Sequence, residues 1–115
     1  MRADALQPLP EVLGSFDLIV TNPPYIPTAE IETLDSSVKD QEPRMALDGG
    51  KDGLDFYRAI FLNARRSMRR GGKLLCELGI GQCGDAAVLL LKNGWRSVEI
   101  YRDLSGIQRV LKCEK

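Results

Sequence analysis

The chain has 115 residues, enough for one domain of ordinary size, and its composition is that of a globular protein. Its 16 basic and 16 acidic side chains cancel, so no overall field would recruit nucleic acid or an anionic membrane. No apolar run approaches the length of a membrane span. The absence of histidine excludes the Ser-His-Asp triad and most zinc sites. Cys76, Cys83 and Cys113 lack metal-site or C-x-x-C spacing, so we interpret them as structural thiols of a cytoplasmic protein.

The first predicted strand is Phe16 to Val20, a nearly continuous apolar run typical of a strand buried on both faces of a parallel sheet. At most a helical turn, around Glu11 to Leu13, precedes it. The strand runs into Thr21 to Tyr25, where two consecutive prolines end it because proline has no N–H to donate and fixes φ. Asn22 and Tyr25 are therefore expected on a stiff turn at the carboxyl end of a strand, the edge at which α/β sheets bind ligands.

The connection from Ile26 to Asp52 has neither a helical nor a strand period, apart from a helical turn predicted near Glu30 to Leu34. A connection of this length in a compact domain is usually functional or disordered. Because it follows directly on the strand-end turn, we expect it to fold over a site. The alternative is that this connection is an ordinary solvent-exposed loop.

A helix is predicted from Leu54, since apolar residues recur at three- and four-residue steps. Asp52 or Asp55 is placed to support its first turn, and Gly71-Gly72 are expected to end it. Its last turns would carry four arginines, which we interpret as a solvated face favoured by the helix dipole rather than as an RNA- or phosphate-binding patch. The expected apolar face is Tyr57, Ile60, Phe61, Ala64 and Met68, and the arginines are Arg65, Arg66, Arg69 and Arg70.

The remainder of the chain predicts three further strands and one helix. The helix runs from Asp85 to Lys92 with Gly94 just past its end. The turn from Asp103 to Gly106 is too short for a helical crossover, so the last two strands should pair antiparallel, whereas the earlier, helix-bearing connections predict parallel pairing. The strands are Lys73 to Leu78, Ser97 to Tyr101 and Gln108 to Lys112.

One motif points to a dinucleotide. Gly79 to Gly84 fits G-x-G-x-x-G between a strand and a helix, and Asp103 lies roughly twenty residues further on. However, the next strand leads into a hairpin rather than a second crossover helix, and the fingerprint would follow the second strand of the domain rather than the first. Nicotinamide or flavin binding stays open as the weaker alternative.

The tetrapeptide Asn22-Pro23-Pro24-Tyr25 suits methyl transfer to a planar nitrogen, whose delocalised lone pair makes it a poor nucleophile. An Asn side-chain oxygen and a main-chain carbonyl can accept the two N–H bonds of such a group and turn its lone pair toward an electrophilic methyl. The prolines leave that carbonyl without a ladder partner, and Tyr25 supplies an aromatic wall. Positioning matters more than a strong base here, in agreement with the absence of histidine. A strand-ending turn with a packing tyrosine is the alternative.

Four segments together resemble the carboxyl-terminal half of the peptide-chain release factor glutamine methyltransferases, the HemK-type family. The resemblance runs in register from about Phe16 to the end of the chain. The tetrapeptide Asn22-Pro23-Pro24-Tyr25 alone is shared with DNA and RNA amino-methyltransferases. The block from Glu42 to Gly53 narrows the resemblance to the glutamine methyltransferases. The segments are FDLIVTNPPYI, EPRMALDGGKDGLDFYR, GGKLLCELGIGQ and DLSGIQRVL.

The resemblance implies an α/β fold, the carboxyl-terminal part of a Rossmann-like S-adenosylmethionine-dependent methyltransferase sheet, mostly parallel with an antiparallel last strand, in spatial order one, two, four, three. It implies methyl transfer to the glutamine of the Gly-Gly-Gln loop of class I release factors, without a metal. By the same resemblance Asn22, Pro23 and Tyr25 would be catalytic, and Asn22 would also lie beside the cofactor. Asn22, Pro23, Pro24 and Tyr25 would bind the substrate amide. A nucleic-acid amino-methyltransferase and a non-catalytic interaction module are the alternatives.

The family's glycine-rich cofactor turn and its amino-terminal substrate-recognition domain would precede residue 1. Residues 1–115 are therefore expected to be a partial catalytic domain, inactive as an isolated chain. The free edge of the first strand would then expose unpaired N–H and C=O groups. We expect another copy of the chain, a rearranged N-terminus or a partner chain to cover this edge.

Overall fold

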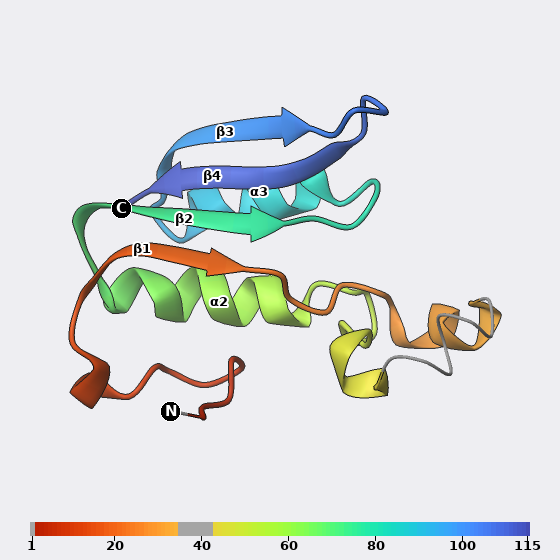
Figure 1. The fold of residues 1–115 in the computed structure, drawn as a ribbon, viewed down its shortest axis with the longest axis horizontal. Helices are drawn as coiled ribbons and strands as arrows, with labels where there is room; N and C mark the ends of the chain where they lie inside the picture. Colours follow the sequence, from red (N-terminus) through yellow and green to blue (C-terminus); the bar gives the residue numbers. More distant parts are fainter. Residues whose placement is uncertain (1, 35–42) are drawn as a thin grey trace.

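The computed structural model describes residues 2–34 and 43–115. Its centre is a four-stranded sheet in the order β1-β2-β4-β3, accompanied by two helices (Figure 1). The strands are β1 (Phe16–Thr21), β2 (Met68–Glu77), β3 (Arg96–Arg102) and β4 (Gln108–Glu114). The α-helices are α2 (Asp55–Arg66) and α3 (Cys83–Lys92), and the 3-10 turns are η1 (Glu11–Leu13), η2 (Thr28–Thr33) and η3 (Arg44–Ala46).

The strand order and directions match the expectation from the sequence. β1 and β2 pair in parallel, and β4 runs antiparallel to both of its neighbours, β2 and β3. β1, β2 and β3 therefore run in the same direction and the last strand runs against them. The carboxyl ends of β1 and β2 consequently meet at one edge of the sheet, which brings the two following loops together.

One face of the sheet carries the hydrophobic core. Leu74 of β2 pairs with Cys113 of β4, and Cys76 pairs with Leu111, so these four buried side chains share a face. They join one cluster with the buried side chains of α2 and α3. Burial raises the pKa of the Cys76 and Cys113 thiols to about 12, and all three cysteines are free, in keeping with a structural role.

The opposite face of the sheet is open at β1. Val20 pairs with Leu75, which alternates with Leu74 and Cys76 and so lies on the face away from the core. Leu18 and Val20 are 54% and 68% exposed. The prediction that this strand is buried on both faces is wrong, because β1 is an edge strand and no described residue covers its outer face.

The end of α2 also differs from the prediction. The helix stops at Arg66, where the Ser67 N–H donates to the carbonyl of Ala64, and Met68 already belongs to β2. The Ser67 carbonyl accepts the Phe16 N–H, which fixes the chain beside β1. Arg69, Arg70, Gly71 and Gly72 therefore lie in β2 and not at a helix terminus.

The two glycines form a bend within the strand. β2 carries more residues than β1 between the pairs Phe16–Met68 and Leu18–Lys73, and Gly71 adopts a φ of 83° there. The Gly71 N–H donates to the carbonyl of Lys115, and the Lys115 N–H donates to the carbonyl of Gly72. The glycine pair correctly indicated a positive φ, which Gly71 adopts, but Gly71 lies within β2 and not at the end of α2.

The remaining elements agree closely with the sequence. α3 begins at Cys83, two residues before the expected start, and Gly94 follows its end with a φ of 84°, as predicted. No helix within residues 2–34 and 43–115 is long and apolar enough to cross a membrane.

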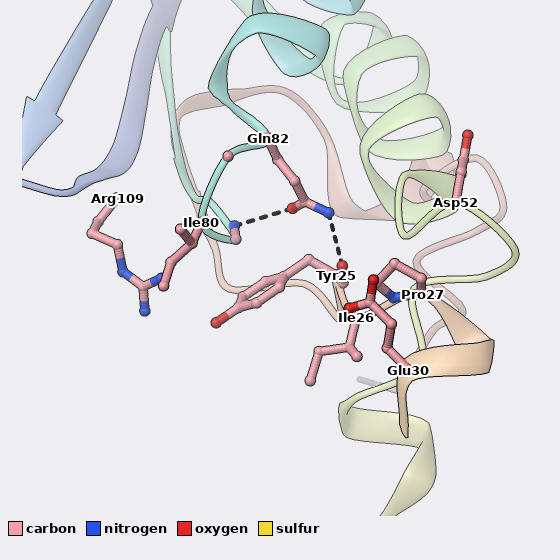
Figure 2. A pocket seen from close by; sticks show the side chains of 10 residues that line it. Tyr25, Ile26, Pro27, Glu30, Asp52, Ile80, Gln82 and Arg109 are labelled. Carbon is pink, nitrogen blue, oxygen red and sulfur yellow. Dashed lines mark hydrogen bonds between the residues drawn. The ribbon is translucent and has the colours of Figure 1, made fainter. Parts of the chain in front are cut away.

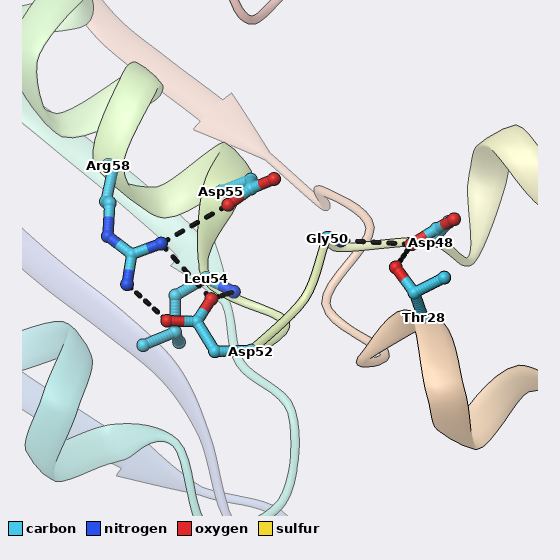
Figure 3. Close-up of polar contacts among 7 residues, drawn as sticks. All are labelled: Thr28, Asp48, Gly50, Asp52, Leu54, Asp55 and Arg58. Carbon is cyan, nitrogen blue, oxygen red and sulfur yellow. Dashed lines mark hydrogen bonds and ion pairs between the residues drawn. The ribbon is translucent and has the colours of Figure 1, made fainter.

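The start of α2 is held by Asp52 (Figure 3). Its carboxylate accepts the Leu54 N–H at 3.0 Å and pairs with Arg58, which also contacts Asp55 at 3.3 Å. Hydrogen bonding from Arg58 first, and from the Leu54 N–H second, lowers the pKa of Asp52 to about 2. Asp52 therefore acts from outside the helix, while Asp55 occupies its first turn.

Replacing Asp52 with Asn should lower stability slightly at neutral pH and make no difference in acid. The folded pKa of about 2 lies below the ordinary value of 3.8, so the stabilisation is complete above about pH 4 and is lost as the pH falls toward about 2. Because both partners are about half exposed, we expect a loss of roughly 0.5–1 kcal/mol. Urea unfolding at several pH values measures it. A deficit that persists unchanged near pH 2 would contradict this origin.

Candidate functional site

The turn after β1 places the predicted site residues at the edge of the sheet. β1 ends at Thr21, and Asn22 is exposed, Pro23 is buried, and Pro24 and Tyr25 are half-buried. Neither the Asn22 side chain nor the Pro23 carbonyl has a hydrogen-bond partner among residues 2–34 and 43–115. The turn thus presents two neighbouring, uncommitted polar groups.

The connection that follows folds back against this turn. The Ile26 N–H donates to the carbonyl of Leu47 at 3.0 Å, and the Gly49 N–H returns a bond to Ile26 at 2.8 Å. Thr28 donates through its hydroxyl to Asp48 at 2.6 Å, and Asp48 also accepts the Gly50 N–H at 3.0 Å (Figure 3). These two bonds, Thr28 first, lower the pKa of Asp48. The described end of the connection therefore packs against the strand-end turn, and its folding over a site stays a prediction.

A part of that connection falls outside the described residues. It includes Glu42, the first residue of the block that carries the narrower family resemblance. The rest of the block is described and contributes η3 and the glycines that approach the turn.

The first hollow beside the turn has a volume of about 410 Å³ and brings all four predicted site residues together. Glu77, at the end of β2, also lines this hollow. The Asn22 carboxamide can both donate and accept, whereas the Glu77 carboxylate accepts. Its lining is Asn22, Pro23, Pro24, Tyr25, Ile26, Ala46, Leu47 and Glu77.

The second hollow, of about 480 Å³, adjoins the first and shares Tyr25 and Ile26 with it. Figure 2 shows the Tyr25 ring near its middle, with Arg109 and Ile80 to one side and Pro27 and Glu30 to the other. Its lining is Tyr25, Ile26, Pro27, Glu30, Asp52, Gly79, Ile80, Gly81, Gln82 and Arg109.

One carboxamide ties the turn to the rest of the fold. Gln82 donates through Nε2 to the Tyr25 carbonyl at 2.8 Å (Figure 2). Its Oε1 accepts from the Tyr57 hydroxyl at 2.9 Å and from the Gly79 N–H at 3.1 Å. Burial raises the pKa of Tyr57, which keeps the hydroxyl protonated as a donor. The loops after β1 and β2 and the helix α2 therefore meet at Gln82.

Three glycines allow this close approach. A Cβ added at Gly49 would lie 2.8 Å from the Tyr25 Cα, and one at Gly53 would lie 2.5 Å from the Tyr25 carbonyl oxygen. A Cβ at Gly79 would lie 2.6 Å from the ring atom Cδ2 of Tyr25. Gly49 and Gly53 come from one segment and Gly79 from the loop after β2, and each packs against Tyr25.

Sequence reasoning missed Gln82 and Tyr57 as parts of this arrangement. Gln82 lies inside the motif considered for a dinucleotide, and Tyr57 was assigned to the helix core. The structure argues against the dinucleotide alternative, since the Gly79 N–H is bound to Tyr57 and Gln82. The carboxylate of Asp103 accepts the N–H groups of Ser105 and Ile107 within its own turn. The Gly79 N–H and one carboxylate oxygen of Asp103 are therefore engaged inside the protein.

Curated proteins similar to this chain carry one name. The "Release factor glutamine methyltransferase" of Geobacter sulfurreducens is 50% identical over 103 residues, covering 88% of this chain and 36% of the relative. The protein of the same name from Prochlorococcus marinus is 42% identical over 106 residues, covering 92% and 36%. The Clostridium botulinum protein is 40% identical over all 115 residues and 41% of its own length. No protein-family model matches the chain.

Solved structures agree on the fold. A "protein-(glutamine-N5) methyltransferase (release factor-specific)" from Alicyclobacillus acidocaldarius superposes with a TM-score of 0.56 at 28% identity, covering 88% of this chain and 49% of that one. A methyltransferase from Pyrococcus furiosus gives a TM-score of 0.61 at 22% identity, covering 89% and 42%. The second likeness supports the methyltransferase-like fold alone.

The chain thus spans little more than a third of the length of the curated relatives it matches. The resemblance predicted from the sequence is confirmed by these relatives, and the α/β fold by the structures.

Replacing Gly79 with Ala should displace Tyr25 or Gln82, since the added Cβ would lie 2.6 Å and 2.5 Å from their side-chain atoms. We expect a loss of about 1–3 kcal/mol in the free energy of unfolding. Gly84→Ala is the matched control, because nothing lies within 4 Å of that Cβ and alanine suits the first turn of α3. Urea denaturation measures both. Equal stability of the two variants would show that the close approach of Gly79 to the turn does not contribute to the free energy of unfolding.

Proposed function

We propose that this chain, a partial-length relative of the release factor glutamine methyltransferases, carries the acceptor-binding part of a protein-(glutamine-N5) methyltransferase. The observation that carries the proposal is the first hollow, in which the unpartnered Asn22 side chain and Pro23 carbonyl stand beside the Tyr25 ring. Methyl transfer to an amide nitrogen needs this combination of two acceptors and a flat wall.

In this proposal Asn22 and Pro23 orient the acceptor. The Asn22 Oδ1 accepts one N–H of the glutamine amide and the Pro23 carbonyl accepts the other, which directs the nitrogen lone pair toward the methyl donor. Tyr25 packs against the amide plane, and Pro24 keeps the turn stiff. The amide nitrogen would gain the methyl as the bond between that methyl and the donor's sulfonium sulfur breaks, and the displaced amide proton would pass to solvent. The chain's residues contribute positioning rather than a strong base.

The methyl would come from S-adenosylmethionine, which supplies an electrophilic methyl group. Asn22 fits a place beside it, because it is exposed at the carboxyl end of β1. Ahead of β1, the described residues contain η1 but no glycine-rich strand–turn–helix. We therefore propose that residues 1–115 form a partial catalytic domain and that another segment binds the rest of the cofactor.

A protein substrate and a cellular location follow from this proposed activity. The protein substrate would be a peptide-chain release factor, and the enzyme would work in the cytoplasm, where three unpaired cysteines stay reduced. The free edge of β1 would be covered by another copy of the chain, by a rearranged N-terminus or by a partner chain.

A chimera tests the role of Asn22. In the Geobacter sulfurreducens relative, the 103 matched residues are replaced by those of this chain. We expect the chimera to methylate a release factor glutamine and Asn22→Ala to lower kcat/KM by about 10²–10³-fold, the usual effect of removing one positioning hydrogen bond. Methyl transfer is followed with labelled S-adenosylmethionine.

Asn93→Ala is the matched control, since its amide bonds the Leu89 carbonyl at the far end of α3. The control should retain near-normal kcat/KM. A chimera that modifies DNA or RNA bases but no glutamine would favour the nucleic-acid alternative. If Asn22→Ala and Asn93→Ala behaved alike, the assignment of Asn22 would be wrong.

The isolated chain should bind S-adenosylmethionine weakly and show no turnover, because the proposal places most of the cofactor contacts on another segment. Titration calorimetry with the 115-residue chain measures this directly. Micromolar binding would overturn the partial-domain proposal.

A further inference from the structure

The second hollow has no role in the proposed chemistry, although it touches the site. It shares Tyr25 and Ile26 with the first hollow and has a volume of about 480 Å³. That volume lies in the range of about 300–1,000 Å³ usual for ligand sites. A glutamine that belongs to a protein arrives with main chain on both sides, so a hollow adjoining the acceptor site is where flanking residues can extend.

The lining of the second hollow suits a peptide better than a polyanion. One carboxylate, Glu30, and one cation, Arg109, line it, while the Asp52 carboxylate points away and is paired with Arg58, so the hollow has no excess of positive charge for a phosphate. A peptide main chain offers carbonyls to the Arg109 guanidinium and N–H groups to Glu30. Arg109 and Glu30 lie on opposite sides of the Tyr25 ring, as a chain crossing the hollow would require (Figure 2).

Ile80 adds an apolar contact at the same place. It stands in the loop after β2 and is 71% exposed, beside the Tyr25 ring (Figure 2). Gly81 follows it, and nothing lies within 4 Å of the place where a Cβ of Gly81 would stand, so a main chain can approach closely there.

Arg109 is available to such a ligand. Its Nη2 lies 3.9 Å from Oε1 of Glu77, the limit of an ion pair, and both side chains are about a third exposed. Partly exposed pairs of this kind contribute little, so a ligand carbonyl can compete for the guanidinium. Because Glu77 lines the first hollow and Arg109 the second, the pair joins the two.

We propose that the second hollow binds the residues flanking the target glutamine, with Arg109 donating to their main-chain carbonyls and Ile80 packing on their backbone. This inference rests on the proposed function, since it takes the first hollow as the place of the glutamine amide.

Nuclear magnetic resonance titration of the 115-residue chain tests the inference. The probe is a neutral hexapeptide with a central glutamine next to two glycines. We expect amide shifts at Ile80, Gly81 and Arg109 as well as at Asn22 and Tyr25. Ile80→Ser and Arg109→Gln should each raise the Kd about five- to tenfold.

Matched controls lie at the end of β3 and in the turn that follows it. Leu104 is fully exposed and Arg102 bonds only the nearby Gly106 carbonyl, so Leu104→Ser and Arg102→Gln should leave the Kd unchanged. Shifts confined to the first hollow, or a Kd that Ile80→Ser and Arg109→Gln do not change, would overturn the inference and leave the proposed function standing. Shifts at the second hollow that persist when the peptide glutamine is replaced by alanine, with none at Asn22, would contradict the proposed function instead. No shift at either hollow up to about a millimolar would overturn both.

Discussion

The Gln82 carboxamide is the interaction on which the site geometry depends. Its nitrogen holds the Tyr25 carbonyl, and its oxygen receives the Tyr57 hydroxyl and the Gly79 N–H. These groups come from the loop after β1, helix α2 and the loop after β2. Strand-to-strand hydrogen bonds do not join these three segments at this edge of the sheet. A half-buried carboxamide that satisfies both its donor and acceptor sides rigidifies the elements it joins. The proline turn therefore keeps its shape because it is fixed from outside as well as from within.

Much of the fold could be predicted because its signals are local. Apolar period, prolines and glycines located every strand and both helices, although β2 begins at Met68, five residues before the predicted Lys73 (73 − 68), and loop lengths fixed the strand directions. The two errors have one physical origin, the tertiary setting of a strand. The apolar composition of β1 suggested burial on two faces, yet burial depends on what covers the strand, and its outer face is open. The Gly71-Gly72 pair signalled a backbone reversal, but the pairing with Lys115 decided that it bends β2 rather than ending α2.

The candidate site likewise has residues that could be predicted from the sequence and residues that only the fold brings to it. Asn22 to Tyr25 could be singled out because a proline pair after an apolar run has a direct backbone consequence. Gln82 and Tyr57 could not, since they are 57 and 32 positions from Tyr25 (82 − 25 and 57 − 25) and no period or motif connects them to it. Gly49, Gly53 and Gly79 gave a visible signal in the sequence, but only the fold shows that all three approach Tyr25.

Gln82 and Tyr57 act together to hold the turn after β1, and a double-mutant cycle tests this cooperation most directly. Urea unfolding of the parent chain, Tyr57→Phe, Gln82→Ala and the double variant isolates the energy that the two side chains share. We expect a coupling of about 1 kcal/mol, the usual contribution of a hydrogen bond of this kind. A coupling indistinguishable from zero would show that the two side chains act independently and would contradict the account.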